Sequence, residues 1–311
     1  MRRLLWPTAA VLLAAGCGSA SGGEAPVPDP RPLGRAADFT AAERTVLHHA
    51  EEAAVQRCME RRGFTYRPVP AADFRRSAES SPYGLLTSDG AAQDGYGMTG
   101  GLLQGQPPDP NATVRAALPE QERRQWQRAL RGSRTEGPKQ VIDVPGGPTV
   151  RVPADSCVHE ATEEVYGKGW DERYLLVQGL RNRVVKKAMA DDGVREAVAR
   201  WADCMKKEGH AFRELQDGPR AVQRALDRAE EQGGRAALQK AGRTELRLAR
   251  LDAGCQRSAK LAEAVDAAQT AVERALPTAD QSALSAFRTA RDQALAKARR
   301  AMKGMASASA P

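Results

Sequence analysis

Apolar positions along most of the chain recur with the spacing of α-helices. Thr40 and Glu43 have the spacing of a capping box, in which a hydroxyl and a carboxylate satisfy the first free amides of a helix. This pattern predicts a helix over residues 41–62 that ends at the following glycine. A second helical pattern covers residues 119–130, and from residue 155 onward the pattern is helical almost throughout. We therefore expect a mainly α-helical fold.

The C-terminal half contains one clear apolar stripe, at positions i, i+4, i+7 and i+11, formed by Val194, Val198, Trp201 and Met205. Gly209 ends this predicted helix. Further helical patterns cover residues 235–276 and 278–302, with Pro277 between them. Both segments are rich in alanine, which lets helices approach closely, so we expect them to form a long antiparallel helical hairpin.

Two stretches depart from the helical pattern. Residues 141–144 and 149–152 are rich in β-branched side chains and flank a Pro-Gly-Gly-Pro turn, which predicts one small β-hairpin. Residues 68–110 hold many prolines and glycines and no periodic apolar pattern. Here we expect a long, loosely structured excursion.

The N-terminus has the features of an export signal. Two arginines precede an apolar stretch of 12 residues, too short to span a membrane and of the length of a secretory signal. The next residues, Ala14-Ala15-Gly16-Cys17, resemble a bacterial lipobox. The resemblance implies a signal peptide over residues 1–16, a lipid on Cys17 and a flexible lipidated tether over residues 17–38. The alternative is a plain signal cleaved after Ala20, which would release the protein.

A ten-residue segment occurs twice. Residues 58–67 align without gaps with residues 204–213, and the Cys, the Met, the Gly and the last Arg are identical. A second cysteine follows each copy, with an aspartate shortly before it and an alanine four residues after it. The pattern indicates one helical plan used twice. It divides the mature chain into a first half (39–170), a second helical half (171–276), and a basic C-terminal helix with a disordered tail (277–311).

This arrangement is similar to uncharacterised lipoproteins of high-GC Gram-positive bacteria, which carry Cys-Met-x-x-x-Gly segments behind a lipobox. The resemblance covers about residues 41–262 and implies no particular activity.

Four cysteines remain after removal of the signal peptide and lipidation of Cys17. An exported protein meets a non-reducing environment, and an even number of cysteines favours pairing. The repeat selects one of the three possible connectivities, Cys58 with Cys157 and Cys204 with Cys255. A zinc site is disfavoured because the sequence contains no Cys-x-x-Cys pair.

The amino-acid composition indicates little about the activity of the protein. Of 311 residues, 41% are hydrophobic and 5% aromatic, an ordinary soluble composition with few large core side chains. The net charge is +8, and basic residues concentrate near the C-terminus. An anionic lipid or wall polymer would attract six of them, Arg288, Arg291, Lys297, Arg299, Arg300 and Lys303. The alternative is a solvated helix end whose charges complement the helix dipole.

Candidate catalytic and ligand motifs are weak. Residues 95–100 match the letters of the dinucleotide fingerprint Gly-x-Gly-x-x-Gly, but no strand precedes them and no helix follows, so we interpret them as a glycine-rich loop. His49 and Glu52 have a spacing that suits a metal, yet no second ligand pair is visible, which favours a solvated helix face. Common hydrolase and phosphate-loop motifs are missing. We expect no catalytic residue, cofactor or metal.

These observations favour a non-enzymatic, lipid-anchored protein on the outer face of the cytoplasmic membrane. It would act by surface contacts with an unknown envelope partner and would not bind nucleic acid. A solute-binding lipoprotein of a transporter fits the anchor and the length, but that class requires repeated strand and helix units around parallel sheets. An exported hydrolase is the third candidate.

Overall fold

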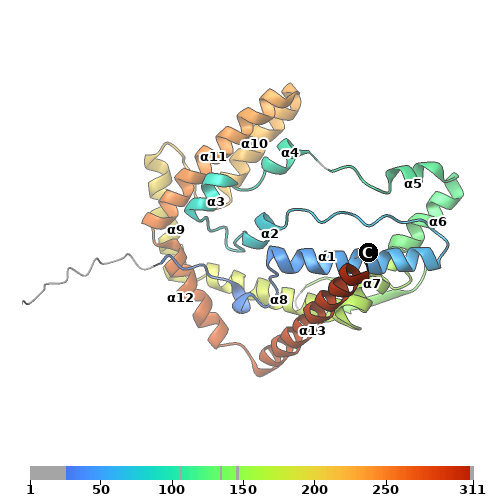
Figure 1. The fold of residues 1–311 in the computed structure, drawn as a ribbon. Helices are drawn as coiled ribbons and strands as arrows, with labels where there is room; N and C mark the ends of the chain where they lie inside the picture. Colours follow the sequence, from blue (N-terminus) through green and yellow to red (C-terminus); the bar gives the residue numbers. More distant parts are fainter. Residues whose placement is uncertain (1–25, 106, 134, 145–146, 309–311) are drawn as a thin grey trace, which may run out of the picture.

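The computed structural model describes residues 26–105, 107–133, 135–144 and 147–308. As predicted, the described part of the chain is mainly helical, with 68% of its residues in helices and one two-stranded antiparallel sheet (Figure 1). The elements are η1 (Pro32–Arg35), α1 (Ala41–Arg61), α2 (Arg75–Glu79), α3 (Ser88–Gln93), α4 (Gly100–Gln104), α5 (Ala112–Ala117), α6 (Glu120–Arg131), β1 (Lys139–Asp143), β2 (Thr149–Pro153), α7 (Cys157–Tyr166), α8 (Trp170–Met189), α9 (Asp192–Lys207), α10 (Asp217–Gln232), α11 (Arg235–Ser258), α12 (Leu261–Arg274) and α13 (Thr278–Ala308).

Helix α1 begins at the predicted capping box. The Thr40 hydroxyl accepts the amide proton of Glu43 at 3.2 Å, and the Glu43 carboxylate accepts that of Thr40 at 3.0 Å. Two amides that have no partner within the helix are thereby satisfied.

The repeated segment forms the same helix end twice. Gly63 follows α1 with a φ of 80°, and Gly209 follows α9 with a φ of 87°, a conformation that glycine adopts at low cost. In each copy the next residue donates its amide proton to the carbonyl of the repeated methionine, at 2.9 Å from Phe64 and 2.8 Å from His210. The two methionine side chains, Met59 and Met205, are fully buried.

Each copy carries one disulfide. Cys58 joins α1 to Cys157 at the start of α7, with the Cα atoms 5.5 Å apart. Cys204 joins α9 to Cys255 in α11, with the Cα atoms 5.6 Å apart. This is the pairing that the repeat predicts.

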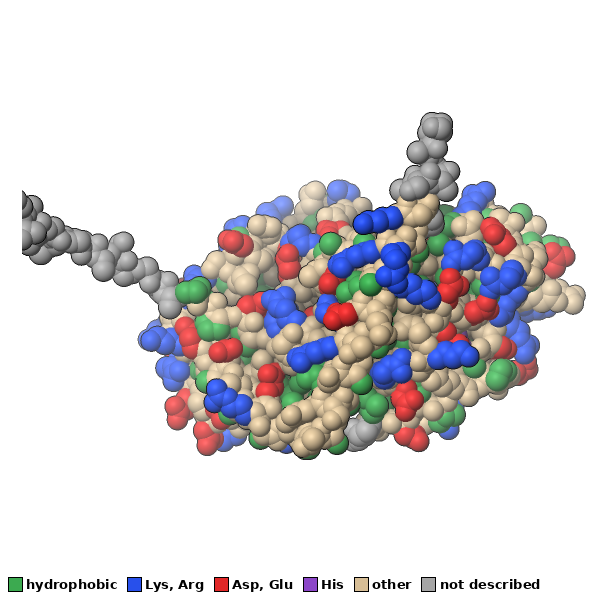
Figure 2. Space-filling model, turned by 60° about the horizontal axis from the view of Figure 1, so that its bottom comes forward, with side chains coloured by type: hydrophobic (Ala, Val, Ile, Leu, Met, Phe, Trp, Pro, Cys, Tyr) green, Lys and Arg blue, Asp and Glu red, His purple; other side chains and the backbone are tan. Residues whose placement is uncertain are grey.

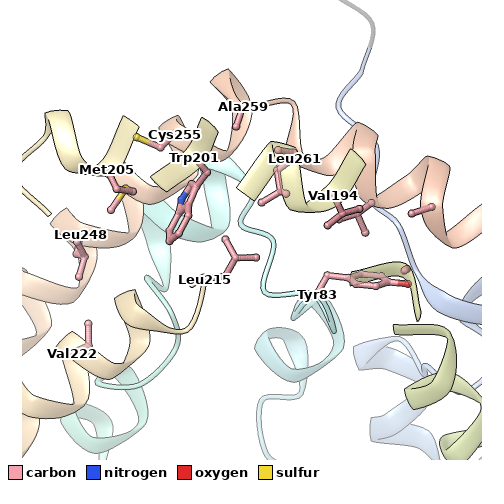
Figure 3. Close-up of a cluster of buried hydrophobic side chains, with 14 of the residues drawn as sticks. Tyr83, Val194, Trp201, Met205, Leu215, Val222, Leu248, Cys255, Ala259 and Leu261 are labelled. Atoms are coloured by element: carbon pink, nitrogen blue, oxygen red, sulfur yellow. The ribbon is translucent and has the colours of Figure 1, made fainter. Parts of the chain in front are cut away.

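The second disulfide borders the largest apolar cluster, which α9 to α12 enclose (Figure 3). The α9 stripe faces this cluster, since Val194, Trp201 and Met205 are fully buried and Val198 packs partly against them. Trp201 lies in the middle, with Leu215 and the disulfide nearby (Figure 3). The predicted stripe therefore identifies the core-facing side of α9.

A second cluster holds the centre of the molecule together and includes residues before α1. The tether predicted over residues 17–38 is wrong for its last part, because Leu33, Ala36 and Ala37 are buried. The Leu33 amide donates to the Glu273 carboxylate at 2.6 Å, and the Arg288 guanidinium donates to the Leu33 carbonyl at 2.9 Å. The sequence did not indicate this packing because the partners come from α12 and α13, more than 200 residues away.

The predicted C-terminal helical hairpin is also wrong. The segment 235–276 breaks into α11 and α12 at Lys260, whose φ is 54°, and α13 turns away after Pro277 to pack on α1, α7 and α8 (Figure 1). Phe287 of α13 is fully buried and stacks on Trp170 of α8, with ring centroids 5.0 Å apart. The antiparallel pair is instead α10 with α11, joined through two glycines.

The division into consecutive halves does not describe the packing. The excursion 68–110 belongs to the first half by sequence, yet its middle part packs on α11. Helix α13 follows the second half but packs on the first. No described helix is both long enough and apolar enough to cross a membrane.

Candidate functional site

A basic hollow of about 1040 Å³ lies between α5, α6 and the β-hairpin. It is at the opposite end of the molecule from α9 and α12 (Figure 1). Among the described residues, one acidic side chain, Asp109, lines it. Six basic side chains line it, namely Arg115, Arg124, Arg128, Arg131, Lys139 and Arg151. We call this surface the basic hollow.

Helix α6 supplies half of these charges from one face. Arg124, Arg128 and Arg131 follow each other at spacings of four and three residues, which places them in one row. The row extends over about 10 Å at the helical rise of 1.5 Å per residue. Trp126 of the same helix also lines the hollow but is only 2% exposed, and its indole N–H donates to the Thr65 carbonyl at 2.9 Å. Burial of Trp126 fixes the orientation of α6 and thereby the direction of the arginine row.

The β-hairpin closes the other side of the hollow. Side chains alternate between the two faces of a strand, so neighbouring positions differ in exposure. Arg151 pairs across the hairpin with Val141, and both are exposed, whereas the neighbouring Ile142 is 3% exposed. The buried isoleucine therefore orients the hairpin so that Arg151 remains in solvent.

Three of the six cations have carboxylate partners. Arg115 lies 2.6 Å from Asp109, Arg128 lies 3.0 Å from Glu136, and Arg124 pairs with Glu120. The hydrogen bond from Arg115 holds the pKa of the Asp109 carboxyl below its ordinary value, so this carboxylate stays charged.

The other three cations differ from one another. The Lys139 ammonium donates to the backbone carbonyls of Ser133, Glu136 and Gly137, which secures the connection between α6 and β1. Arg131 and Arg151 make no ion pair with any described residue. Lys139 therefore keeps its full charge but has its donors in use, whereas the planar donors of Arg131 and Arg151 are not taken up by an ion pair and suit phosphate and carboxylate groups.

A second hollow, of about 740 Å³, lies between the excursion and the helices α10 to α12. Many of its polar side chains are already used within the protein. Arg75 and Arg76 both contact the Asp94 carboxylate, and the hydrogen bond from Arg75 lowers the pKa of Asp94. Gln256 accepts from the Leu86 amide at 2.9 Å. This hollow therefore offers a ligand fewer available charges than the basic hollow.

The glycine-rich loop of residues 95–100 binds a carboxylate of this same chain. Glu245 of α11 is fully buried and accepts from the amides of Tyr96, Met98 and Thr99 at 2.8 to 3.0 Å, and also from the Thr99 hydroxyl. Gly95 has a φ of 64°, and a Cβ there would lie 2.6 Å from the Glu245 side chain. The loop amides that could bind a phosphate are therefore occupied, and the excursion is docked rather than loose.

Asp252, two turns further along α11, makes a second buried contact with the excursion. Its carboxylate accepts from the Tyr96 hydroxyl at 2.7 Å, the Trp201 indole at 2.8 Å and the Gln256 amide at 2.9 Å. Burial raises the pKa of Asp252 above its ordinary value, although these hydrogen bonds oppose the shift.

Because its pKa is raised on folding, Asp252 binds its proton more tightly in the folded than in the unfolded state. Its contribution to stability therefore falls as the pH rises above about 4, where the unfolded carboxyl ionises. Asp252→Asn removes this dependence. The free energy of unfolding of the variant should therefore rise relative to that of the wild-type protein as the pH increases above about 4. Urea unfolding of both proteins across that range measures it, with the exposed Asp203→Asn as control. A difference that does not change with pH would contradict the prediction.

The basic C-terminal residues largely contact the protein itself. Arg291 donates to the Asp38 carbonyl at 3.0 Å and to Glu43 at 2.9 Å, and lies 4.8 Å from the centre of the Phe39 ring. Arg288 contacts Leu33, Lys297 contacts the Glu164 carbonyl, and Arg299 lies 4.0 Å from Glu43. On the face that carries α13, acidic side chains lie between the basic ones (Figure 2). These contacts tie α13 to the core and leave less charge for a surface partner.

Of the pair with a spacing that suits a metal, Glu52 has structural partners. Glu52 accepts from the Tyr66 hydroxyl at 2.9 Å and the Val69 amide at 2.7 Å, and the neighbouring His48 donates from a ring nitrogen to the Val69 carbonyl at 2.8 Å. Within the described residues, no group of three or more His, Cys, Asp or Glu side chains is placed to hold a metal ion. Cys17 and the lipobox lie outside the described residues.

Sequence reasoning missed the basic hollow. The spacing of Arg124, Arg128 and Arg131 on a predicted helix was visible and indicated a charged face. The convergence of α5 and the hairpin on that face is tertiary, and no local pattern predicts it. No protein-family model, curated protein or solved structure matches this chain.

Proposed function

We propose that the protein is a non-enzymatic, lipid-anchored protein of the cell envelope that binds an anionic envelope component in the basic hollow. The observation that carries this proposal is that six cations and one carboxylate line a single concave surface, and that three of the six cations have no carboxylate partner among the described residues. Concave surfaces lined by one sign of charge raise the local concentration of oppositely charged ligands and speed their association.

The compartment is supported by the cysteines. Both disulfides indicate an extracytoplasmic domain, because such bonds persist in oxidising compartments and are rare in the cytosol. An exported anionic partner is consistent with that location.

The placement of the N-terminal segment supports a contact directed away from the membrane. Val27 and Pro28 line the second hollow together with residues that begin α10 and α12. Val27 lies ten positions after Cys17 in the sequence, and a chain of that length reaches at most about 35 Å. A lipid on Cys17 would hold this end of the protein near the bilayer, with the basic hollow at the opposite end.

A solute-binding lipoprotein is the second candidate, and the second hollow favours it. The second hollow has a volume of about 740 Å³, which lies in the range of small-molecule sites. The described residues, however, form one two-stranded sheet, whereas that class is built on repeated strand and helix units. The low strand content of the described residues therefore disfavours the solute-binding class, and we retain the first proposal.

The anchor has a direct test. Replacing Cys17 with alanine removes the thiol that accepts the lipid, so incorporation of a labelled fatty acid should be lost. The protein should shift from the membrane fraction to the medium or remain as an uncleaved precursor. The nearby Ser21→Ala is the control and should retain the label. Unchanged labelling of Cys17→Ala would exclude lipidation at this residue.

Binding to the envelope tests the role of the hollow. The full chain, solubilised in detergent, should sediment with isolated cell envelopes at low salt and be released as salt screens the charges. Reversing two charges, with Arg131→Glu and Arg151→Glu, should abolish the salt-sensitive part of this sedimentation, because a lipid on Cys17 contributes a part that does not depend on charge. Reversing two exposed charges on α10, with Arg224→Glu and Arg228→Glu, is the matched control. Equal sedimentation of both double variants would reject the hollow as the contact surface.

A further inference from the structure

The shape of the basic hollow restricts its ligand. Three arginines of α6 form a row of about 10 Å, and Arg151 extends from the hairpin on the other side. A volume of about 1040 Å³ far exceeds one phosphate group. Charges spread along a row in a large hollow suit a ligand whose own charges repeat along a chain.

The side chains favour phosphate as the repeated charge. Five of the six cations are arginines, whose forked donors bind phosphate oxygens in pairs. Phosphate also presents oxygens in several directions, so one group can be bound by α6 and by the hairpin at once. Arg131 and Arg151, which have no carboxylate partner among the described residues, are the two side chains best placed to do this.

Two alternative ligands fit less well. Stacking of nucleic-acid bases requires an exposed aromatic face. Among the described residues that line the hollow the one aromatic side chain is Trp126, which is 2% exposed and has the Arg115 guanidinium 5.5 Å from its ring centre. A bilayer surface is broad and nearly flat, so it cannot enter a concave site between a helix and a hairpin.

We infer that the basic hollow binds a linear polymer with repeated phosphodiester groups and contacts several phosphates at once. This inference rests on the proposed function and specifies its partner. Arg131 and Arg151 are the two arginines of the hollow that form no ion pair with a described residue, so they carry the contacts to the polymer.

Calorimetric titration of the full chain in detergent with poly(glycerol phosphate) tests the inference. The comparison ligands are free glycerol phosphate at equal phosphate concentration and polyglutamate of equal charge number. The phosphate polymer should bind at least about tenfold more tightly than either, because several charge-assisted contacts act together. Equal binding of polyglutamate would overturn the choice of phosphate, and equal binding of the monomer would overturn the multiple contacts.

Variants locate the binding site. Arg131→Ala with Arg151→Ala should weaken polymer binding by about tenfold or more and reduce the slope of log Kd against log salt by about two, one for each lost phosphate contact. Arg224→Ala with Arg228→Ala removes the same charge from α10 and should leave Kd unchanged within about twofold. Unchanged binding by the first variant would place the polymer elsewhere.

Competition separates this inference from the proposed function. Vesicles rich in anionic lipid should not displace the polymer, and displacement at equal charge would overturn the inference in favour of a lipid ligand. Envelope sedimentation that depends on Arg131 and Arg151 without a preference for the phosphate polymer would leave the proposed function intact and reject the polymer. Loss of both would reject both.

Discussion

Removing the first disulfide, by Cys58→Ala with Cys157→Ala, is expected to lower the free energy of unfolding by about 4 to 5 kcal/mol. The bond closes a loop with a sequence separation of 99 residues, and opening it restores conformational entropy to the unfolded chain. Domains of this kind have a total stability of about 5 to 15 kcal/mol. Thermal and urea unfolding of both proteins measure the loss.

The second disulfide is the matched comparison. Its sequence separation is 51 residues, so Cys204→Ala with Cys255→Ala should cost about 0.6 kcal/mol less than removal of the first. Peptide mapping without reduction should show the same two pairs in the wild-type protein. A peptide that links Cys58 to Cys204, or a first double variant as stable as wild type, would contradict the assignment.

Replacing Glu245 with alanine is expected to cost about 3 to 5 kcal/mol and to release the glycine-rich loop from α11. The carboxylate is fully buried and accepts four hydrogen bonds from Tyr96, Met98 and Thr99. Without it, three backbone amides must find water or remain without an acceptor. Urea unfolding gives the energetic loss, and hydrogen exchange at these three amides shows whether the loop has left.

Two variants serve as controls for this prediction. Glu245→Gln keeps one acceptor oxygen, and its amide group can donate to the Thr99 hydroxyl, so the loss should be smaller, about 1 to 2 kcal/mol. Glu231→Ala removes an exposed carboxylate near the end of α10 and should change stability by less than about 0.5 kcal/mol. Unchanged amide protection in Glu245→Ala would show that the excursion is docked by other contacts.

Features with local causes were predictable from the sequence. The capping box at Thr40, the glycines that end α1 and α9, and the apolar stripe ending at Met205 all depend on residues within a few turns of each other. Short-range hydrogen bonds and helical periodicity determine such elements. The two disulfide pairs could also be predicted from the sequence, because the internal repeat indicated equivalent cysteines in equivalent helices.

The docking of the excursion and the packing of α13 required the tertiary structure. Glu245 meets its loop across 146 to 149 residues, and Arg291 meets Glu43 across 248. Nothing in the sequence around Glu245, Arg291 or Glu43 distinguishes them from the many other acidic and basic residues of the chain. Which of them are buried together depends on how the helices pack.

The sequence by itself determined the helix Ala41–Arg61, the helix that ends before Gly209 and the β-hairpin, because these depend on local spacing, and the repeat indicated the pairing of the cysteines. Only the tertiary structure decided that the Gly-rich loop binds a carboxylate of the same chain and that α13 belongs to the core. It alone brought Arg131 of α6 and Arg151 of the hairpin to one hollow. The physical reason is that the burial of a side chain and the clustering of charges depend on contacts between segments that are distant in the sequence. No local pattern of residues predicts those contacts.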